Sequence, residues 1–241
     1  MPEQFDVSLV LPCYNEAEHF NLSVDRIIRV LDGTDFSWEI IFIDDASTDI
    51  TADLIKSYIK KTPRKHLTVY SHRKNLGRGA TVTEGIEKSQ GKIVGYIDID
   101  CEVPPDYIPQ FVSAIDNGAD FAVGWRIYDF TIKSLPRWFA SKGYNRIRNG
   151  VLNTSLKDTE AGYKFFRKSK ILPVLKQCIS PGWFWDTEVT VRAQRAGLKI
   201  KEMPVVFIRR FDKASTVKLI PDTFVYLKEL WRFKRKLDNS C

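Results

Sequence analysis

Short apolar runs alternate with longer amphipathic stretches along the first half of the chain. The apolar runs cover Val7–Leu11, Glu39–Ile43, Leu67–Tyr70, Ile93–Ile97 and Phe121–Val123. Between them, the pattern predicts helices over about Glu16–Leu31 and Thr48–Lys60. Continuous apolar strands separated by helices are typical of a parallel sheet that is covered on both faces. The sequence therefore predicts an α/β domain with a mostly parallel central sheet flanked by helices.

The composition of the 241-residue chain is that of a globular protein, with 44% apolar and 28% charged residues. Its four cysteines are scattered without a CxxC pair, which disfavours disulfides and structural zinc and favours a reducing compartment. No signal peptide is predicted, and no apolar run approaches the roughly 18 residues of a membrane span. We therefore expect a cytoplasmic location, with the cytoplasmic face of a membrane as one site of action. The net charge of +7 suits an anionic partner: phosphate, nucleotide, nucleic acid or an acidic membrane.

Basic residues interleaved with aromatics mark two later segments, residues 126–148 and 224–236. We expect one domain over residues 1–217 and a basic amphipathic helix over residues 218–241. Such a helix is either a solvated face over a core stripe or an element that lies on an anionic bilayer. The sequence leaves both interpretations open.

Three acids follow the predicted strand at Ile93–Ile97. Alternate side chains of an extended chain point the same way, so Asp98, Asp100 and Glu102 could share one face. Crowded carboxylates repel one another unless a cation lies among them, and hard oxygen ligands suit Mg²⁺ or Mn²⁺. The alternative is a set of solvated turn acids, but the position after an apolar strand favours a metal site.

Two further strand-end motifs have both a structural and a functional explanation. Asp44 and Asp45 precede Ser47 and Thr48, which could cap the next helix, whereas an acid at this edge could also bind ribose hydroxyls. The run Asn75–Ala80 holds two glycines around an arginine and is either a tight turn or a diphosphate-binding helix start.

Three later stretches also carry candidate chemistry. Asp158–Lys164 places polar residues beside a glycine, and Trp183–Glu188 places acids after three aromatics, as in sugar-binding surfaces or a packed core. Arg209–Ser215 supplies hydrogen-bond donors that suit a phosphate.

These motifs, taken together and in order, resemble glycosyltransferase family 2. The matching set is Pro12-x-Tyr14-Asn15-Glu16, Asp44-Asp45-x-Ser47, Gly77-x-Gly79, Asp98-x-Asp100 and Asp158-x-x-x-Gly162. Within the family, the chain looks most like dolichyl-phosphate mannose synthases and other polyprenyl-phosphate glycosyltransferases. The resemblance extends from about Val7 to Ser215, nearly the whole chain, and implies the nucleotide-diphospho-sugar transferase (GT-A) fold.

The resemblance also implies roles for individual residues. The donor nucleotide sugar would be bound by Pro12, Tyr14, Glu16, Asp44, Ser47, Gly77, Gly79 and Asp98. The divalent ion, Mg²⁺ or Mn²⁺, would be held by Asp98, Asp100 and Glu102. The acceptor phosphate would meet Arg126, Arg148, Arg209 and Ser215. The residues expected around the reaction centre are Asp98, Asp100, Asp158, Asp186 and Glu188.

Three positions depart from the family pattern. Trp125 stands where serine is usual, Glu102 where glutamine is frequent, and Glu160 lies inside the Asp158 motif. Many members carry C-terminal membrane spans, and this sequence has none. The resemblance therefore implies a soluble or peripheral enzyme, with a membrane partner subunit as a further expectation.

The predicted activity is inverting transfer of a sugar, mannose or glucose, from a nucleotide-sugar donor to a polyprenyl or dolichyl phosphate. One alternative is a family 2 enzyme that acts on a sugar hydroxyl, which would need a general base: Asp158, Asp186 or Glu188. A sugar nucleotidyltransferase is disfavoured because residues 11–18 are acidic and lack glycine. A non-enzymatic basic membrane- or nucleic-acid-binding module is the other alternative, and the strand-end acids argue against nucleic acid.

Overall fold

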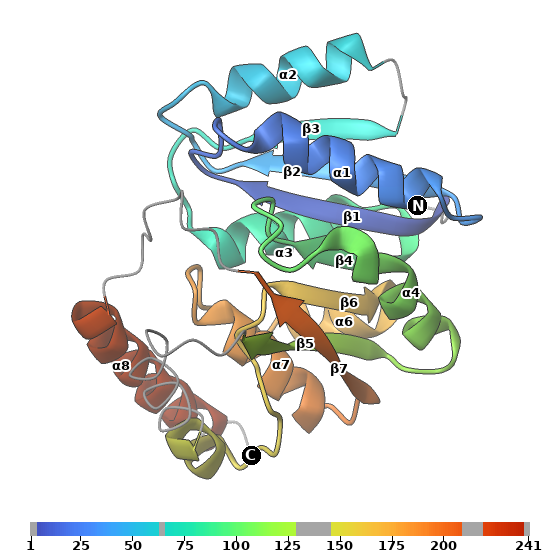
Figure 1. Cartoon of the computed structure of the whole chain (residues 1–241). Helices are drawn as coiled ribbons and strands as arrows, with labels where there is room; N and C mark the ends of the chain where they lie inside the picture. The colour runs from blue at the N-terminus through green and yellow to red at the C-terminus, as the bar shows by residue number, and fades with distance from the viewer. Residues whose placement is uncertain (1–3, 63–65, 129–145, 209–218, 239–241) are drawn as a thin grey trace.

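The computed structural model describes residues 4–62, 66–128, 146–208 and 219–238, with the side chains of 219–224 left out. Its centre is a seven-stranded sheet in the order β3-β2-β1-β4-β6-β5-β7 (Figure 1). The strands are β1 (Phe5–Cys13), β2 (Trp38–Asp44), β3 (Leu67–Ser71), β4 (Gly91–Ile97), β5 (Phe121–Tyr128), β6 (Tyr163–Arg167) and β7 (Ile200–Phe207). Only β6 runs antiparallel to its neighbours, β4 and β5. The predicted α/β fold with a mostly parallel sheet is confirmed.

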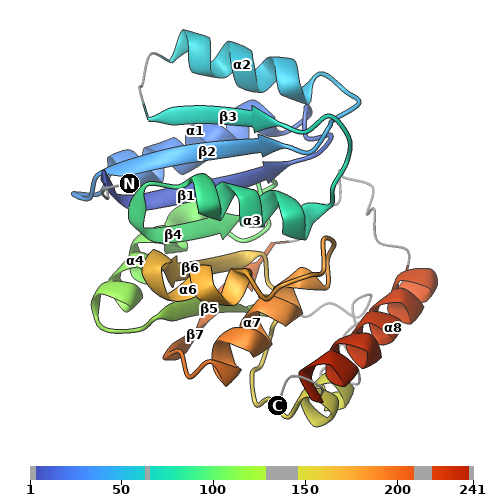
Figure 2. The same ribbon diagram turned by 180° about the vertical axis from the view of Figure 1, so that it is seen from behind.

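Helices cover both faces of this sheet. They are α1 (Phe20–Asp32), α2 (Thr51–Lys61), α3 (Arg78–Lys88), α4 (Ile108–Asp116), α6 (Lys168–Leu175), α7 (Trp185–Arg195) and α8 (Leu219–Asp238). A short 3₁₀ helix, η1, covers Pro105–Tyr107, and residues 146–152 are also helical. On one face α1, α2 and α4 enclose a core with the odd-numbered residues of β1. On the other face α3, α6 and α7 enclose a second core, seen from behind in Figure 2.

Two helices begin later than the sequence pattern predicts. The first starts at Phe20 and not near Glu16, because residues 14–19 form the loop beyond β1. The second starts at Thr51, so neither Ser47 nor Thr48 caps it, and its N-cap position makes no side-chain capping bond. The loop between β2 and α2 is therefore longer than expected and extends across the carboxyl edge of the sheet.

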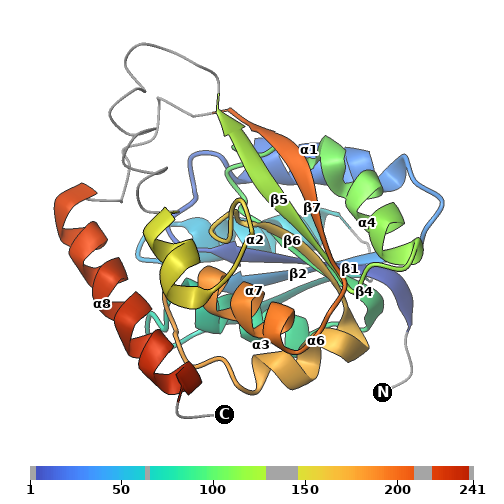
Figure 3. The same ribbon diagram turned by 90° about the horizontal axis from the view of Figure 1, so that it is seen from below.

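Over residues 225–238, the described side chains of the C-terminal helix α8 (Leu219–Asp238) are buried on one side of the helix. Its Leu230, Phe233 and Leu237 are buried in one cluster with Phe184 and Leu152. Figure 3 shows α8 beside the 146–152 helix. The opposite side exposes Trp231, 55% accessible, among basic residues. In the described part of the chain, no helix is both long enough and apolar enough to cross a bilayer.

Candidate active site

Two loops at the carboxyl edge of the sheet are fastened together by Asn15. Its side-chain Oδ1 accepts the backbone N–H groups of Thr48 at 2.8 Å and of Asp49 at 3.3 Å. In return, Ser47 Oγ accepts the backbone N–H of Asn15 at 3.0 Å. Asn15 has φ 55°, in the left-handed region that asparagine tolerates better than most residues. The loops after β1 and β2, residues 14–19 and 45–50, are therefore joined by hydrogen bonds into one surface, called here the cross-linked wall.

Five of the residues predicted to bind the donor lie on these two loops or at the strand ends that lead into them: Pro12, Tyr14, Glu16, Asp44 and Ser47. Tyr14 is 45% exposed, whereas Pro12 and Glu16 are half-buried. Asp44 is buried, and its Oδ1 accepts the backbone N–H of Ser47 at 3.3 Å. The structure thus brings all five predicted residues to one edge, with the ring of Tyr14 outermost.

Asp45 ties this wall to the start of α3. Its carboxylate accepts the backbone N–H groups of Leu76 at 2.7 Å and Gly77 at 2.9 Å. Its Oδ1 also lies 2.6 Å from Nδ1 of His72, whose Nε2 lies 2.8 Å from Glu84 Oε2. Asp45 is therefore a structural anchor, and two of the amides predicted to meet a diphosphate are bound to it in this structure.

The imidazole between these two carboxylates makes stability depend on pH. Burial lowers the pKa of His72, but hydrogen bonds and charge from Asp45 and Glu84 outweigh burial and raise it above 6.5. A raised folded-state pKa means that His72 stabilises the fold fully below pH ~6.5, and that this contribution is lost as pH rises through the folded-state value. The same Glu84 also pairs with Lys88, whose Nζ lies 3.5 Å from Glu84 Oε1.

We therefore expect His72→Gln to lower the free energy of unfolding more at about pH 5.5 than at about pH 9. Chemical denaturation of both proteins at each pH measures the difference. A loss of the same size at both values would contradict the pairing of His72 with Asp45 and Glu84.

The two glycines of the predicted diphosphate loop are required by the fold. Gly77 has φ 93°, and a Cβ there would lie 2.6 Å from the carbonyl oxygen of Pro181. A Cβ on Gly79 would overlap the side chain of Trp185. The tight-turn explanation thus accounts for both glycines. Arg78 is the residue between them.

The acids after β4 lie on a turn and not on an extended strand. Cys101 has φ 54°, and its backbone N–H donates to the carbonyl of Asp98 at 3.2 Å. Asp98, Asp100 and Glu102 are each half-buried, with Ile99 buried between the first two. Among the described residues, however, no three acid, histidine or cysteine side chains gather closely enough to hold an ion. The turn replaces the extended backbone on which the expected alignment of the three carboxylates depends.

Arg78 connects Asp98 to a cluster of buried charges. Its Nε and one terminal nitrogen donate to Asp98 Oδ1 at 3.0 and 2.6 Å, and its other terminal nitrogen donates to Asp186. Asp186 is 1% exposed; it accepts a bond from the Tyr96 hydroxyl and one of 2.6 Å from Lys164 Nζ, itself fully buried. Burial lowers the pKa of Lys164, and Asp186 opposes this shift.

Asp158 and Arg126 form a second ion pair at the end of β5. The Arg126 guanidinium donates to both Asp158 oxygens, at 2.7 and 3.1 Å. Burial raises the pKa of Asp158, but the charge and hydrogen bonds of Arg126 outweigh burial and lower that pKa to about 2. The guanidinium lies 5.8 Å from the centres of the Tyr128 and Phe207 rings and 3.8 Å from Glu160.

Arg148 and Glu188 are buried and bind the protein itself. Arg148 is fully buried, and its guanidinium donates to Thr159 Oγ1 at 3.0 Å and to the carbonyl of Leu156 at 2.7 Å. Glu188 accepts the backbone N–H of Ser180 at 2.8 Å and pairs with Arg192 at 2.9 Å. Both side chains therefore hold loops near the site. The remaining predicted residues, Arg209 and Ser215, lie outside the described residues.

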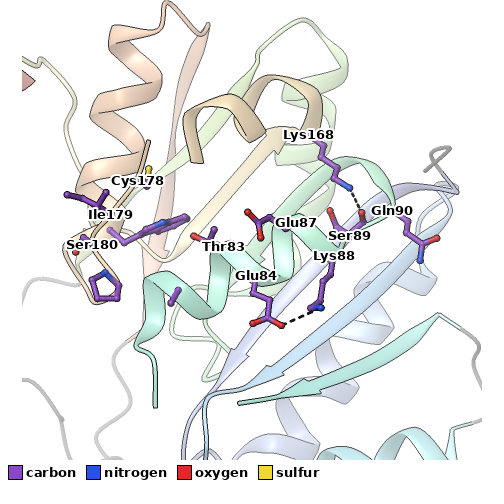
Figure 4. Close-up of a pocket in the computed structure, with 13 residues that line it drawn as sticks. Thr83, Glu84, Glu87, Lys88, Ser89, Gln90, Lys168, Cys178, Ile179 and Ser180 are labelled. Carbon is purple, nitrogen blue, oxygen red and sulfur yellow. Dashed lines mark hydrogen bonds and ion pairs between the residues drawn. The ribbon is translucent and has the colours of Figure 1, made fainter. Parts of the chain in front are cut away.

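A groove among the described residues lies away from these acids. It measures about 760 Å³ and runs between α3 and residues 178–181. Figure 4 shows Glu84, Lys88 and Ser89 along it, with Lys168 bonded to Ser89. None of the strand-end acids Asp44, Asp98 or Asp100 lines this groove. Ligands of open α/β sheets bind beyond the carboxyl ends of the strands, so we place the candidate active site at the edge and not in the groove.

A family model for glycosyl transferase family 2 matches residues 8–172 of the chain. The chain belongs to glycosyl transferase family 2. The resemblance identified from the sequence motifs is thereby confirmed, and the protein is an enzyme that transfers a sugar.

Two curated relatives extend the comparison. Glycosyltransferase AglD of Haloferax volcanii is 29% identical over 222 residues, covering 90% of this chain but only 35% of AglD. The chain thus spans about a third of that relative. The dolichyl-phosphate beta-glucosyltransferase of Dictyostelium discoideum is 28% identical over 251 residues, covering 95% of this chain and 77% of the relative.

Two solved structures of similar fold hold a nucleotide or nucleotide sugar together with Mn²⁺. Glucosyl-3-phosphoglycerate synthase of Mycobacterium tuberculosis, in complex with Mn²⁺, UDP and product, has a TM-score of 0.65 at 17% identity, covering 95% of this chain and 78% of the other. Mannosyltransferase PcManGT of Pyrobaculum calidifontis, with GDP-Man and Mn²⁺, has a TM-score of 0.59 at 18% identity, covering 88% and 60%. At these identities the likeness shows the fold, which the sequence predicted as GT-A.

The carboxylates of Asp98 and Asp100 after β4 have the chemistry that suits a divalent ion. Burial raises the pKa of Asp98 and neighbouring Asp100 adds to that rise, whereas Arg78 lowers it, so the site favours added positive charge. Mg²⁺ typically takes one or two carboxylates and completes its shell with water and substrate phosphates. Asp98 and Asp100 would therefore be sufficient to bind such an ion without the third predicted ligand, Glu102.

Three residues of the site were not singled out from the sequence. Tyr96 and Lys164 lie within apolar strands, and their bonds to Asp186 join residues 90 and 22 positions apart. The one feature of the sequence that could have indicated Lys164 is its place between Tyr163 and Phe165 in a buried strand. Arg78 was noted only as the residue between two glycines.

Proposed function

We propose that this protein is an inverting, metal-dependent hexosyltransferase that moves glucose or mannose from a nucleoside-diphosphate sugar to a polyprenyl or dolichyl phosphate. The family membership supports sugar transfer. Relatives named dolichyl-phosphate beta-glucosyltransferase, which this chain covers to 77%, support the lipid phosphate and favour glucose.

The observation that carries the proposal is the state of the three candidate general bases. Asp158 is paired with Arg126, and its pKa is lowered to about 2. The Asp186 and Glu188 carboxylates are buried in hydrogen bonds with protein cations. A hydroxyl acceptor needs a base to accept its proton. A phosphate monoester does not, because its second pKa of about 6 leaves it largely dianionic at neutral pH.

The acceptor phosphate would meet arginine at the end of β5. Arg126 stays on the surface, with 20% of its side chain exposed, and its pairing with Asp158 fixes the plane of the guanidinium. Planar, oriented guanidinium groups suit phosphate oxygens. Arg209 and Ser215 remain candidates for the same phosphate, whereas the buried Arg148 would act by holding residues 156–159.

The donor would lie along the cross-linked wall. Its nucleoside would contact Tyr14 and the Asp44–Ser47 turn, and its diphosphate would face Asp98 and Asp100. A bound Mg²⁺ or Mn²⁺ would neutralise charge on the departing nucleoside diphosphate. Asp98 and Asp100 would hold that ion. An oxygen of the acceptor phosphate would bond to the anomeric carbon from the side opposite the nucleoside diphosphate, whose bond to that carbon would break, and the configuration would be inverted.

A donor panel tests this proposal. UDP-glucose, GDP-mannose and UDP-N-acetylglucosamine would each be incubated with Mn²⁺ and a short polyprenyl phosphate, and the lipid-linked product followed. We expect product from one donor and loss of product on chelation of the metal. Donor binding without lipid product would contradict the proposed acceptor.

We also propose that the outward side of α8 rests on an anionic membrane. This side carries Trp231 with the exposed cations Lys228, Arg232 and Arg235, while its opposite side is buried in the domain. Tryptophan and basic residues on one side of a helix suit the headgroup region of anionic lipid. The placement fits an enzyme at the cytoplasmic face whose acceptor is embedded in the bilayer, with or without a membrane partner subunit.

Vesicle co-sedimentation measures this membrane contact. We expect the protein to sediment with vesicles that contain phosphatidylserine and to remain largely free of neutral vesicles, and Trp231→Ser with Arg235→Gln to weaken binding several-fold. The matched control is Arg195→Gln, an exposed cation at the end of α7. Equal binding to both vesicle types would contradict the assignment.

A further inference from the structure

We propose that Arg78 is the resident counter-ion of the metal site: it neutralises Asp98 in the donor-free enzyme, and the metal with its donor diphosphate displaces it from Asp98 onto the diphosphate. The proposal rests on the metal-dependent donor binding argued above, and it assigns a donor-binding role to a residue outside the predicted donor-binding and metal-binding sets.

The contacts of Arg78 are those of a cation held between two anions. It donates twice to Asp98 Oδ1, at 2.6 and 3.0 Å, through one side of the guanidinium. The other side donates to Asp186. Asp98 is on the open side of this arrangement, with 41% of its side chain exposed, whereas the Asp186 side chain is 2% exposed. A divalent ion approaching from solvent therefore reaches Asp98 and not Asp186.

The aromatic rings around Arg78 restrict how the guanidinium can move. Its central carbon lies 5.3 Å from the centre of the Tyr96 ring and 5.2 Å from that of Trp183. Trp183 is 58% exposed, so one of these rings faces solvent. Contact with aromatic faces favours a cation without satisfying its hydrogen bonds, so the N–H groups that leave Asp98 can turn to a new acceptor.

The buried ion pair of Asp186 and Lys164 explains why Arg78 keeps its position when a metal ion binds Asp98. Asp186 accepts a hydrogen bond of 2.6 Å from Nζ of the fully buried Lys164 and another from the Tyr96 hydroxyl. Burying two charges is costly unless they are well bonded, so this pair makes a fixed anchor. Arg78 can release Asp98 and remain bonded to Asp186 at its other end. Lysine could not do both, because it lacks the fork of donors.

If Arg78 is displaced in this way, removing it should change metal affinity and nucleotide affinity in opposite directions. A cation beside Asp98 opposes binding of a dication, so removing it should strengthen metal binding in the absence of nucleotide. The same cation should attract the diphosphate, so removing it should weaken nucleotide binding when metal is saturating. A residue with a purely structural role would weaken both.

The test is Arg78→Gln, with Arg195→Gln as a control that removes one exposed positive charge elsewhere. Mn²⁺ binding without nucleotide would be measured by electron paramagnetic resonance. UDP and GDP binding at saturating Mn²⁺ would be measured by calorimetry. For Arg78→Gln we expect several-fold tighter Mn²⁺ binding and nucleotide binding weaker by on the order of 10-fold. Arg195→Gln should change neither affinity. Arg78→Lys should have affinities between those of the wild-type and Arg78→Gln proteins.

Unchanged or weaker Mn²⁺ binding by a folded Arg78→Gln protein would overturn the inference. If that variant does not fold, the Arg78→Lys protein decides by the same two measurements. A wild-type protein that binds neither Mn²⁺ nor nucleotide would overturn the proposed function as well. A wild-type protein that transfers sugar while Arg78→Gln leaves Mn²⁺ binding unchanged would overturn this inference alone.

Discussion

Asp100→Ala is expected to reduce kcat/KM for sugar transfer by on the order of 10²–10³-fold or more, because a carboxylate that holds the ion on the donor diphosphate is lost. Asp100 lies on the turn after β4, half-buried, and its Oδ1 accepts the Glu102 backbone N–H at 3.2 Å. The measurement is nucleoside diphosphate release with the donor found in the panel, over a range of Mn²⁺ concentrations.

The matched control is Asp116→Ala, which removes an exposed acid at the end of α4. It should keep wild-type activity and wild-type dependence on Mn²⁺. Activity of the Asp100→Ala protein within tenfold of wild type, with unchanged dependence on Mn²⁺, would contradict the metal role of Asp100.

Asp186→Asn is expected to lower the free energy of unfolding by about 3–5 kcal/mol, the range for breaking a buried ion pair. The side chain keeps its shape but loses its charge, which leaves Lys164 and Arg78 as two neighbouring cations without their shared anion. Denaturation in urea, followed by circular dichroism, measures the loss.

The result also separates two roles for Asp186. A general base would lose activity on this substitution while stability stayed near wild type. A structural anchor loses stability first. Asp116→Asn, the exposed counterpart, should change stability by no more than about 0.5 kcal/mol. A stable but inactive Asp186→Asn protein would revive the hydroxyl-acceptor alternative.

The parallel half of the fold could be predicted because its strands are continuous apolar runs with polar residues directly after them. β1, β2 and β4 lie where the pattern placed them, within a few residues. β6 was missed because it is a five-residue strand that contains the buried Lys164 and pairs antiparallel between two distant strands. No local pattern reveals such a pairing.

The same limit applies to the site. Motif order was enough to bring Tyr14, Asp44 and Asp98 to one edge of the sheet. It could not reveal that Arg78 bridges Asp98 and Asp186, residues 20 and 108 positions away, because both ion pairs depend on tertiary packing. Nor could it reveal the turn at Cys101, where a positive φ interrupts the extended backbone before Glu102.

The most direct test of the account compares two acceptors that differ only in the phosphate. A short polyprenyl phosphate and the polyprenol of the same chain length would be supplied with the active donor and Mn²⁺, and lipid-linked sugar would be quantified. The account predicts product from the phosphate, little or none from the alcohol, and loss of both donor use and product on chelation. Equal or faster transfer to the alcohol would contradict it, because a hydroxyl acceptor requires a general base and Asp158, Asp186 and Glu188 are all held in ion pairs.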